Sequence, residues 1–139
     1  MVAHALATSD SRSGEILARY GGDEFAILLP ETDLAAASAL GRRLCEGVRE
    51  MTVPNAGSSG VGYVTISVGV ACVTPLRGRS PMRPTMLVEA ADHALYAAKA
   101  AGRNRVAELA IQAASWAGAI VSTTAPEAET VKSAAGAKM

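Results

Sequence analysis

The segment Gly21-Gly22-Asp23-Glu24 places two adjacent carboxylates beside two residues that lack side chains. The glycines leave room for a bulky ligand against the backbone, and we expect Asp23 and Glu24 to face that space. Carboxylate oxygens suit Mg²⁺, which prefers one or two protein carboxylates together with substrate phosphates. The same residues are also typical of a polar turn without a ligand. Residue types alone therefore leave a metal site and a plain turn both open.

Two cations follow much later in the chain, Lys99 and Arg103. Both are predicted at the C-terminal end of a helix, where the helix dipole favours positive charge. From there both could contact a triphosphate beside the glycine turn. Taken alone, they are equally well explained as solvated surface charges.

The elements that must position these residues are predicted from hydrophobic patterns. Short apolar runs on both sides of the Gly-Gly pair predict a β-hairpin. Thr32 is a candidate N-cap for a helix that continues to about Met51, because apolar residues recur at steps of three or four. A long strand is predicted over Tyr63–Val73, a second helix over Thr85–Ala101 with a stop at Gly102, and a last strand over Arg105–Leu109. This alternation predicts an α/β sheet with helices packed on it.

The last part of the chain, residues 110–139, is rich in alanine, serine and threonine. Such a composition buries little apolar surface. We therefore expect one domain over residues 1–109 and a disordered tail over residues 110–139.

Composition excludes several classes of function. The 13 basic and 13 acidic residues balance, which gives no electrostatic basis for binding nucleic acid. The apolar stretch Ala110–Val121 is too short to span a membrane. Cys45 and Cys72 have no metal or redox spacing, so we expect buried reduced thiols and a cytoplasmic location. His4 and His93 lack nearby ligand partners and are interpreted as ordinary surface or packing residues.

Four stretches together resemble the GGDEF family of diguanylate cyclases, in order and in spacing. They cover roughly residues 12 to 109. The stretches are Arg19-Tyr20-Gly21-Gly22-Asp23-Glu24-Phe25, Pro30-Glu31-Thr32, Thr65-Ile66-Ser67-Val68-Gly69-Val70-Ala71, and Ala91-Asp92-His93-Ala94-Leu95-Tyr96-Ala97-Ala98-Lys99-Ala100-Ala101-Gly102-Arg103-Asn104.

This resemblance implies an activity and a set of roles. Two GTP molecules would condense to cyclic di-GMP with release of pyrophosphate, between two domains that meet as a symmetric homodimer. Asp23 and Glu24 would bind Mg²⁺ (or Mn²⁺) and help to activate the attacking hydroxyl. Gly21 and Gly22 would admit the nucleotide. The resemblance also implies that phosphate-binding side chains are Lys99 and Arg103.

The resemblance departs from the family pattern at the N-terminal end. Nothing in Met1–Ser11 resembles the family's first strand and first helices, which carry an aspartate metal ligand and the guanine contacts. The implied fold is therefore a partial GGDEF (nucleotidyl cyclase-like) fold of the α/β class, a central β-sheet flanked by helices without the first strand and first helices. Unpaired sheet backbone is then expected. The alternative function is a non-catalytic module that at most binds GTP or cyclic di-GMP.

A product-inhibition site is partly present by resemblance. The family's Arg-x-x-Asp motif corresponds to Arg12-Ser13-Gly14-Glu15, in which glutamate replaces aspartate and lengthens the side chain by one methylene. Arg43 matches a second contact that some family members use, although a solvated helix arginine explains it as well. We expect weakened feedback by cyclic di-GMP.

Overall fold

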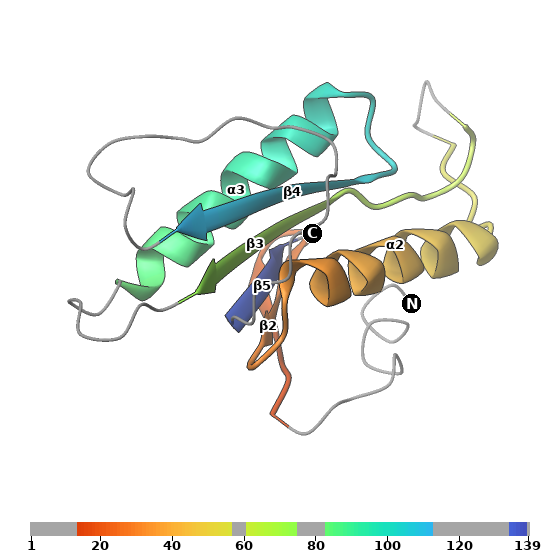
Figure 1. Cartoon of the computed structure of the whole chain (residues 1–139). Coiled ribbons are helices and arrows are strands. Elements are labelled where there is room, and N and C mark those ends of the chain that lie inside the picture. Colours follow the sequence, from red (N-terminus) through yellow and green to blue (C-terminus); the bar gives the residue numbers. More distant parts are fainter. Residues whose placement is uncertain (1–13, 57–60, 75–82, 113–133, 139) are drawn as a thin grey trace.

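A computed structural model of the chain describes residues 14–56, 61–74, 83–112 and 134–138. Two long helices and a five-stranded sheet make up this part of the chain (Figure 1). The helices lie on opposite faces of the sheet, which confirms the predicted α/β class. In chain order, the elements are β1 (Ile16–Gly21), β2 (Glu24–Leu29), α2 (Leu34–Glu50), β3 (Val68–Thr74), α3 (Pro84–Ala100), β4 (Val106–Gln112) and β5 (Ala134–Lys138).

The predicted hairpin is present as the antiparallel pair β1 and β2. Helix α2 follows, and its N-cap is Asp33 rather than the predicted Thr32. The Asp33 carboxylate accepts a hydrogen bond of 2.7 Å from the Ala36 N–H, whereas the Thr32 hydroxyl donates to the Pro30 carbonyl. The apolar face of α2 packs on the sheet through buried residues that include Leu44 and Val48.

Strands β3 and β4 are parallel neighbours. Parallel strands need a long crossover connection, and helix α3 is part of that connection here. Helix α3 has Pro84 at its first turn, where proline is well tolerated. It lies very close to β3 at Gly69. A Cβ built on Gly69 would meet the Ala91 carbonyl oxygen at 2.2 Å, so only glycine fits at this position.

The sheet order is β1-β2-β5-β3-β4, so β5 from the end of the chain lies inside the sheet. It pairs antiparallel with β2 on one side and antiparallel with β3 on the other. The unpaired backbone expected of the sheet is therefore not found between β2 and β3, because β5 occupies that place.

Two further differences separate the structure from the sequence predictions. The long strand predicted from Tyr63 begins only at Val68, and Tyr63 instead makes an isolated bridge with Pro54. Residues 110–112 belong to β4 and residues 134–138 form β5, although a disordered tail was predicted from residue 110. The other residues of that predicted tail, 113–133 and 139, lie outside the described part of the chain.

The core has two layers, one on each face of the sheet. On the α2 face it contains Ile27, Leu29, Val68 and Val70, and on the α3 face Ala71, Val73, Ala90, Ala91 and Ile111. Cys45 and Cys72 are both buried free thiols, as predicted. Among the described residues, neither helix is long and apolar enough to cross a membrane.

Candidate active site

The turn between β1 and β2 carries the predicted carboxylates. Gly21 pairs with Glu24, which leaves Gly22 and Asp23 as the two turn residues. Gly22 has a φ of +54°, a conformation that favours glycine. A Cβ built on Gly21 or Gly22 would have no atom within 4 Å. The described structure therefore leaves open space beside both glycines.

Arg19 holds this turn in place. Its guanidinium donates two hydrogen bonds to the Gly22 carbonyl oxygen, at 3.0 Å from Nε and 2.7 Å from Nη2. Sequence reasoning included Arg19 only as part of a motif and assigned it no role. A hairpin whose turn is fixed by a side chain three residues away presents Asp23 and Glu24 in a defined orientation.

Glu24 lies beside Lys99, although the two residues are far apart in the chain. The Lys99 Nζ is 3.6 Å from the Glu24 Oε1, and both side chains are partly exposed, at 44% and 35%. The structure therefore brings together one predicted metal ligand and one predicted phosphate ligand. Lys99 is on α3, which lies in close contact with Gly69 of β3, whereas Glu24 is the first residue of β2.

The end of α3, between Lys99 and Arg103, is closed by backbone hydrogen bonds. The Gly102 N–H donates to the Lys99 carbonyl and the Arg103 N–H donates to the Ala98 carbonyl, which are the two hydrogen bonds of a Schellman motif. Gly102, Arg103 and Asn104 have φ values of +111°, +60° and +49°. A left-handed arginine is uncommon, which indicates that this turn is held by its surroundings.

The other two charged site residues, Asp23 and Arg103, do not form an ion pair with each other in the described part of the chain. Both side chains are exposed. The same part holds no group of three or more His, Cys, Asp or Glu residues that could bind a metal ion. Two adjacent carboxylates at an open turn still fit Mg²⁺, because this ion takes its other ligands from water and substrate phosphates.

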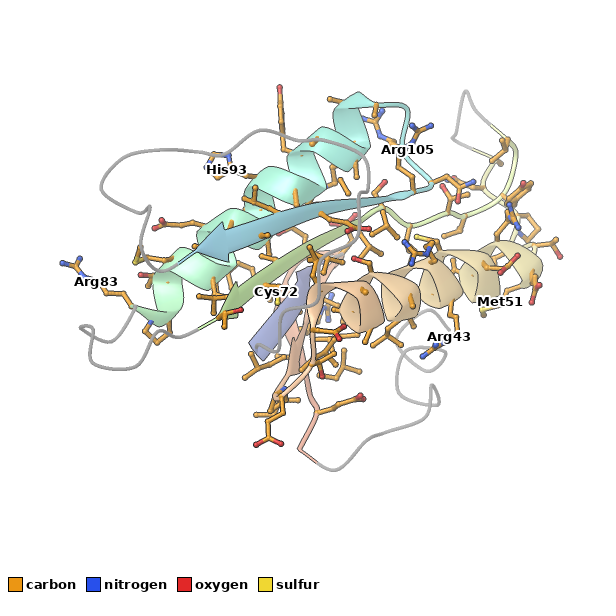
Figure 2. All side chains as sticks on the ribbon, in the orientation of Figure 1. Arg43, Met51, Cys72, Arg83, His93 and Arg105 are labelled. Carbon is orange, nitrogen blue, oxygen red and sulfur yellow. The ribbon has the colours of Figure 1, made fainter. Side chains whose placement is uncertain are left out.

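Of the three residues predicted for product inhibition, the structure describes Glu15 and Arg43. Arg12 lies outside the described residues. Glu15 directly precedes β1, and Arg43 projects from α2 away from β3 and β4 (Figure 2). His93 is exposed on α3, as predicted, while His4 lies outside the described residues.

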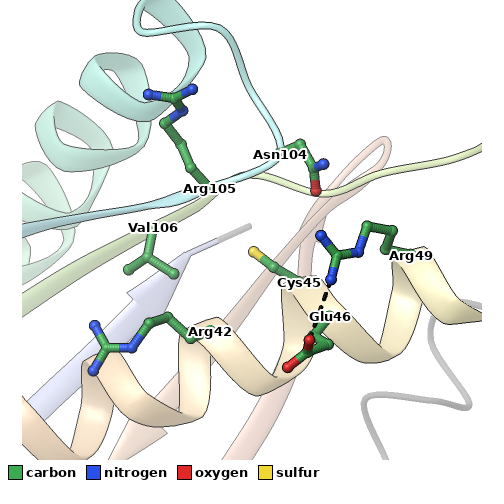
Figure 3. A pocket seen from close by; sticks show the side chains of 7 residues that line it. All are labelled: Arg42, Cys45, Glu46, Arg49, Asn104, Arg105 and Val106. Atoms are coloured by element: carbon green, nitrogen blue, oxygen red, sulfur yellow. Dashed lines mark hydrogen bonds and ion pairs between the residues drawn. The ribbon is translucent and has the colours of Figure 1, made fainter. Parts of the chain in front are cut away.

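A pocket of about 370 Å³ lies between α2 and the start of β4 (Figure 3). Its two α2 arginines already have acidic partners, Arg42 with Glu108 at 3.4 Å and Arg49 with Glu46 at 3.2 Å. Arg105 directs its Nε to the Arg103 carbonyl. The lining keeps a net positive charge, with three arginines and one glutamate, and it does not include Glu24 or Lys99. The lining residues are Arg42, Cys45, Glu46, Arg49, Asn104, Arg105 and Val106.

Comparison with known proteins adds independent evidence. Residues 1–105 match the family model described as Diguanylate cyclase, GGDEF domain. The chain is 41% identical over 95 residues to Probable diguanylate cyclase DgcT of Escherichia coli (strain K12), which covers 68% of this chain and 20% of that protein.

Two further relatives have similar sequence identities to this chain. Diguanylate cyclase A of Treponema denticola is 38% identical over 99 residues, covering 70% of this chain and 25% of that protein. Response regulator PleD of Caulobacter vibrioides is 37% identical over 98 residues, covering 70% of this chain and 21% of that protein. The chain thus spans about a fifth to a quarter of the length of these relatives. On this evidence, the chain belongs to the diguanylate cyclase GGDEF domain family.

Proposed function

We propose that this chain is the catalytic part of a diguanylate cyclase, which condenses two GTP molecules to cyclic di-GMP. The observation that carries the proposal is the ion pair of Glu24 with Lys99, at 3.6 Å. It supports a site in which the carboxylates of the glycine turn and the cations at the end of α3 act on one nucleotide. The names of the relatives point to the same activity.

In the proposed reaction, the 3′-hydroxyl of each GTP attacks the α-phosphorus of the other. Each attack forms a new O3′–P bond and breaks the bond from the α-phosphorus to the bridging oxygen, so that two pyrophosphates leave. The hydroxyl protons pass to solvent or to a nearby carboxylate. A symmetric homodimer supplies this geometry, because each subunit holds one nucleotide facing the other.

The residues take the following roles in this proposal. Gly21 and Gly22 leave space for the nucleotide against the hairpin backbone. Asp23 and Glu24 would hold a magnesium or manganese ion, which would supply neutralisation of phosphate charge. Lys99 and Arg103 bind phosphate oxygens.

The ion pair suggests how the free site changes when GTP binds. In the free protein Lys99 partly neutralises Glu24. A triphosphate carries more negative charge than one carboxylate and competes for the ammonium group. Lys99 would then bind phosphate, and the Glu24 carboxylate would be released for the metal ion.

A second candidate function is a non-catalytic module that at most binds GTP or cyclic di-GMP. The described residues favour it in one respect, since they offer only two adjacent carboxylates and no group of three metal ligands. Incubation of the purified protein with GTP and Mg²⁺ separates the two functions. Cyclic di-GMP that forms with the wild type and is lost in Glu24→Gln supports the cyclase, whereas GTP binding without product supports the module.

Feedback by the product forms part of the proposal. Cyclic di-GMP would bind through Arg12 and Glu15, with Arg43 as a further contact, and the longer glutamate would weaken it. Tighter binding of cyclic di-GMP to Glu15→Asp than to the wild type supports this reading, and equal binding contradicts it. GTP as the substrate and two buried free thiols fit a cytoplasmic location.

A further inference from the structure

The pocket between α2 and the start of β4 is a second place where a small molecule can bind. Its volume of about 370 Å³ falls within the range of small-molecule sites. None of the residues assigned to the metal ion, the GTP molecule or the product lines it. The pocket is thus separate from the candidate site, and its own lining decides what it can hold.

Positive charge predominates in the lining. Three arginines contribute positive charge, on α2 and at the start of β4, and Glu46 contributes the one negative charge. Glu108 lies outside the lining but pairs with Arg42 at 3.4 Å, so that counting it leaves three positive charges against two negative ones. A surplus of positive charge on a concave surface attracts anions and repels metal ions. The ligand class that fits is therefore an anion.

Two side chains lie toward one another across the pocket, Arg49 from α2 and Asn104 from the turn before β4 (Figure 3). Among the described residues, the Asn104 side chain has no hydrogen-bond partner. Arg49 donates to Glu46 at 3.2 Å, and the exposed fractions of these two side chains are 49% and 60%. An exposed ion pair contributes little to stability, so an anion in the pocket can take the place of Glu46.

Arg42 and Arg105 border the pocket on either side of Val106 (Figure 3). Arg105 donates from its Nε to the Arg103 carbonyl, and within the described ranges its two Nη groups have no acceptor. A guanidinium group carries five N–H donors at the end of a long, flexible side chain. Both arginines therefore retain donors for a ligand, and Val106 between them supplies an apolar wall.

We propose that this pocket binds a small compound that carries a phosphate group. Arg49 and Asn104 hold the phosphate oxygens from opposite sides, and Arg42 and Arg105 complete the contact. Guanidinium groups match the geometry of phosphate and bind it through two parallel hydrogen bonds. The rest of the compound lies against Val106. Binding there does not depend on the proposed cyclase function, because none of the residues assigned to GTP or metal takes part.

The proposed ligand lies beside the turn that presents Arg103. Asn104 follows Arg103 directly, and the two have left-handed backbones, with φ values of +49° and +60°. Arg105 holds the Arg103 carbonyl through its Nε at 3.1 Å. A ligand on Asn104 and Arg105 therefore contacts the two residues that follow Arg103, without occupying the open space beside Gly21 and Gly22.

The first experiment titrates the ¹⁵N-labelled full chain with ribose 5-phosphate, inorganic phosphate and ribose, at constant ionic strength and without GTP or Mg²⁺. Ribose 5-phosphate is expected to shift the amide signals of Arg49, Asn104 and Arg105 and to leave those of Asp23 and Glu24 in place. Equal affinity for inorganic phosphate identifies free phosphate as the ligand, and weaker affinity identifies a phosphate ester; both support the site. No shifts up to about 10 mM, equal shifts with ribose, or shifts centred on Asp23 and Glu24 overturn it.

A second experiment compares variants that each lose one positive charge. Arg49→Gln is expected to bind ribose 5-phosphate at least 10-fold more weakly than the wild type, because a charge-assisted contact is lost. Arg83→Gln is the matched control, since Arg83 precedes α3 at the end of the helix remote from Arg105 (Figure 2), and it is expected to retain the wild-type affinity.

Asn104→Asp guards against a folding defect in Arg49→Gln. Aspartate, like asparagine, tolerates the left-handed backbone at this position, but its carboxylate repels the phosphate. Its affinity for ribose 5-phosphate is expected to fall at least 10-fold while its thermal melting temperature stays close to that of the wild type. Equal affinities of the wild type, Arg49→Gln and Asn104→Asp overturn the proposal, as does an equal loss of affinity in Arg83→Gln and Arg49→Gln.

Discussion

The backbone of Gly69 lies directly against the backbone of Ala91, so that a Cβ on Gly69 would be 2.2 Å from the Ala91 carbonyl oxygen. This contact fixes the distance between β3 and α3. Since Lys99 is at the end of the same helix, the contact also positions Lys99 relative to β3.

Gly69→Ala is expected to destabilise the protein by about 3 kcal/mol, because the new methyl group meets backbone that cannot move aside easily. Gly47→Ala is the matched control, since a Cβ built at this helix position would have no atom within 4 Å. That control is expected to be neutral or stabilising by up to about 1 kcal/mol. Urea denaturation measures both, and equal stabilities of the two variants would contradict the close packing.

Lys99→Met tests the ion pair with Glu24. Both groups are partly exposed, so the loss of the pair is expected to cost less than about 1 kcal/mol of folding free energy. GTP binding is expected to weaken about 10-fold, because a charge-assisted phosphate contact is lost. Calorimetry with GTP and Mg²⁺ measures the affinity. Lys99→Arg, which keeps the charge, should retain most of the binding, and an unchanged affinity in Lys99→Met would remove Lys99 from the proposed site.

Arg19→Ala is expected to loosen the turn, because both guanidinium hydrogen bonds to the Gly22 carbonyl disappear. The expected loss of stability is about 1 kcal/mol. Amide hydrogen exchange at Gly22, Asp23 and Glu24 should accelerate while exchange in α2 stays the same. Arg19→Lys keeps one donor group, so its exchange rates at the turn are expected to lie between those of the wild type and Arg19→Ala. If exchange at the turn were unchanged in Arg19→Ala, the hydrogen bonds from Arg19 to the Gly22 carbonyl would not stabilise the turn.

Cys45 provides a prediction about pH. Burial raises the pKa of its thiol from 9.0 to about 11. Above pH 9 the unfolded chain loses this proton while the folded protein retains it, so stability falls as the pH rises from about 9 to 11. The loss attributable to this thiol is on the order of 2 kcal/mol. Stability of the wild type should therefore fall more steeply over this range than that of Cys45→Ala, and parallel curves would contradict the raised pKa.

Much of the fold could be predicted because it depends on local sequence patterns. The glycine pair predicts the hairpin, and the spacing of apolar residues predicts both helices. Tyr63–Ser67 was wrongly included in a strand, because its β-branched residues resemble one while most of its backbone has no strand partner. The strand β5 was not predicted, because its alanines and glycine carry no strand pattern and its pairing is entirely long-range.

The sequence predicted which residues belong to the candidate site better than it predicted how their side chains contact one another. The family pattern pointed to Glu24 and Lys99, but their contact joins α3 to β2 and depends on long-range packing, which residue types do not specify. The role of Arg19 depends on how its side chain folds back over the turn, which residue types do not specify.

In the proposed function, one metal ion and one nucleotide bind between the glycine turn and the end of α3. Paramagnetic Mn²⁺, added with a non-hydrolysable GTP analogue to ¹⁵N-labelled protein, tests it directly, because it broadens the amide signals closest to it. We expect selective broadening at Gly22, Asp23 and Glu24 together with Gly102 and Arg103, and we expect Glu24→Gln to abolish it. Broadening centred on Arg42 and Arg49 in the pocket beside α2, or broadening unaffected by Glu24→Gln, would exclude this binding site.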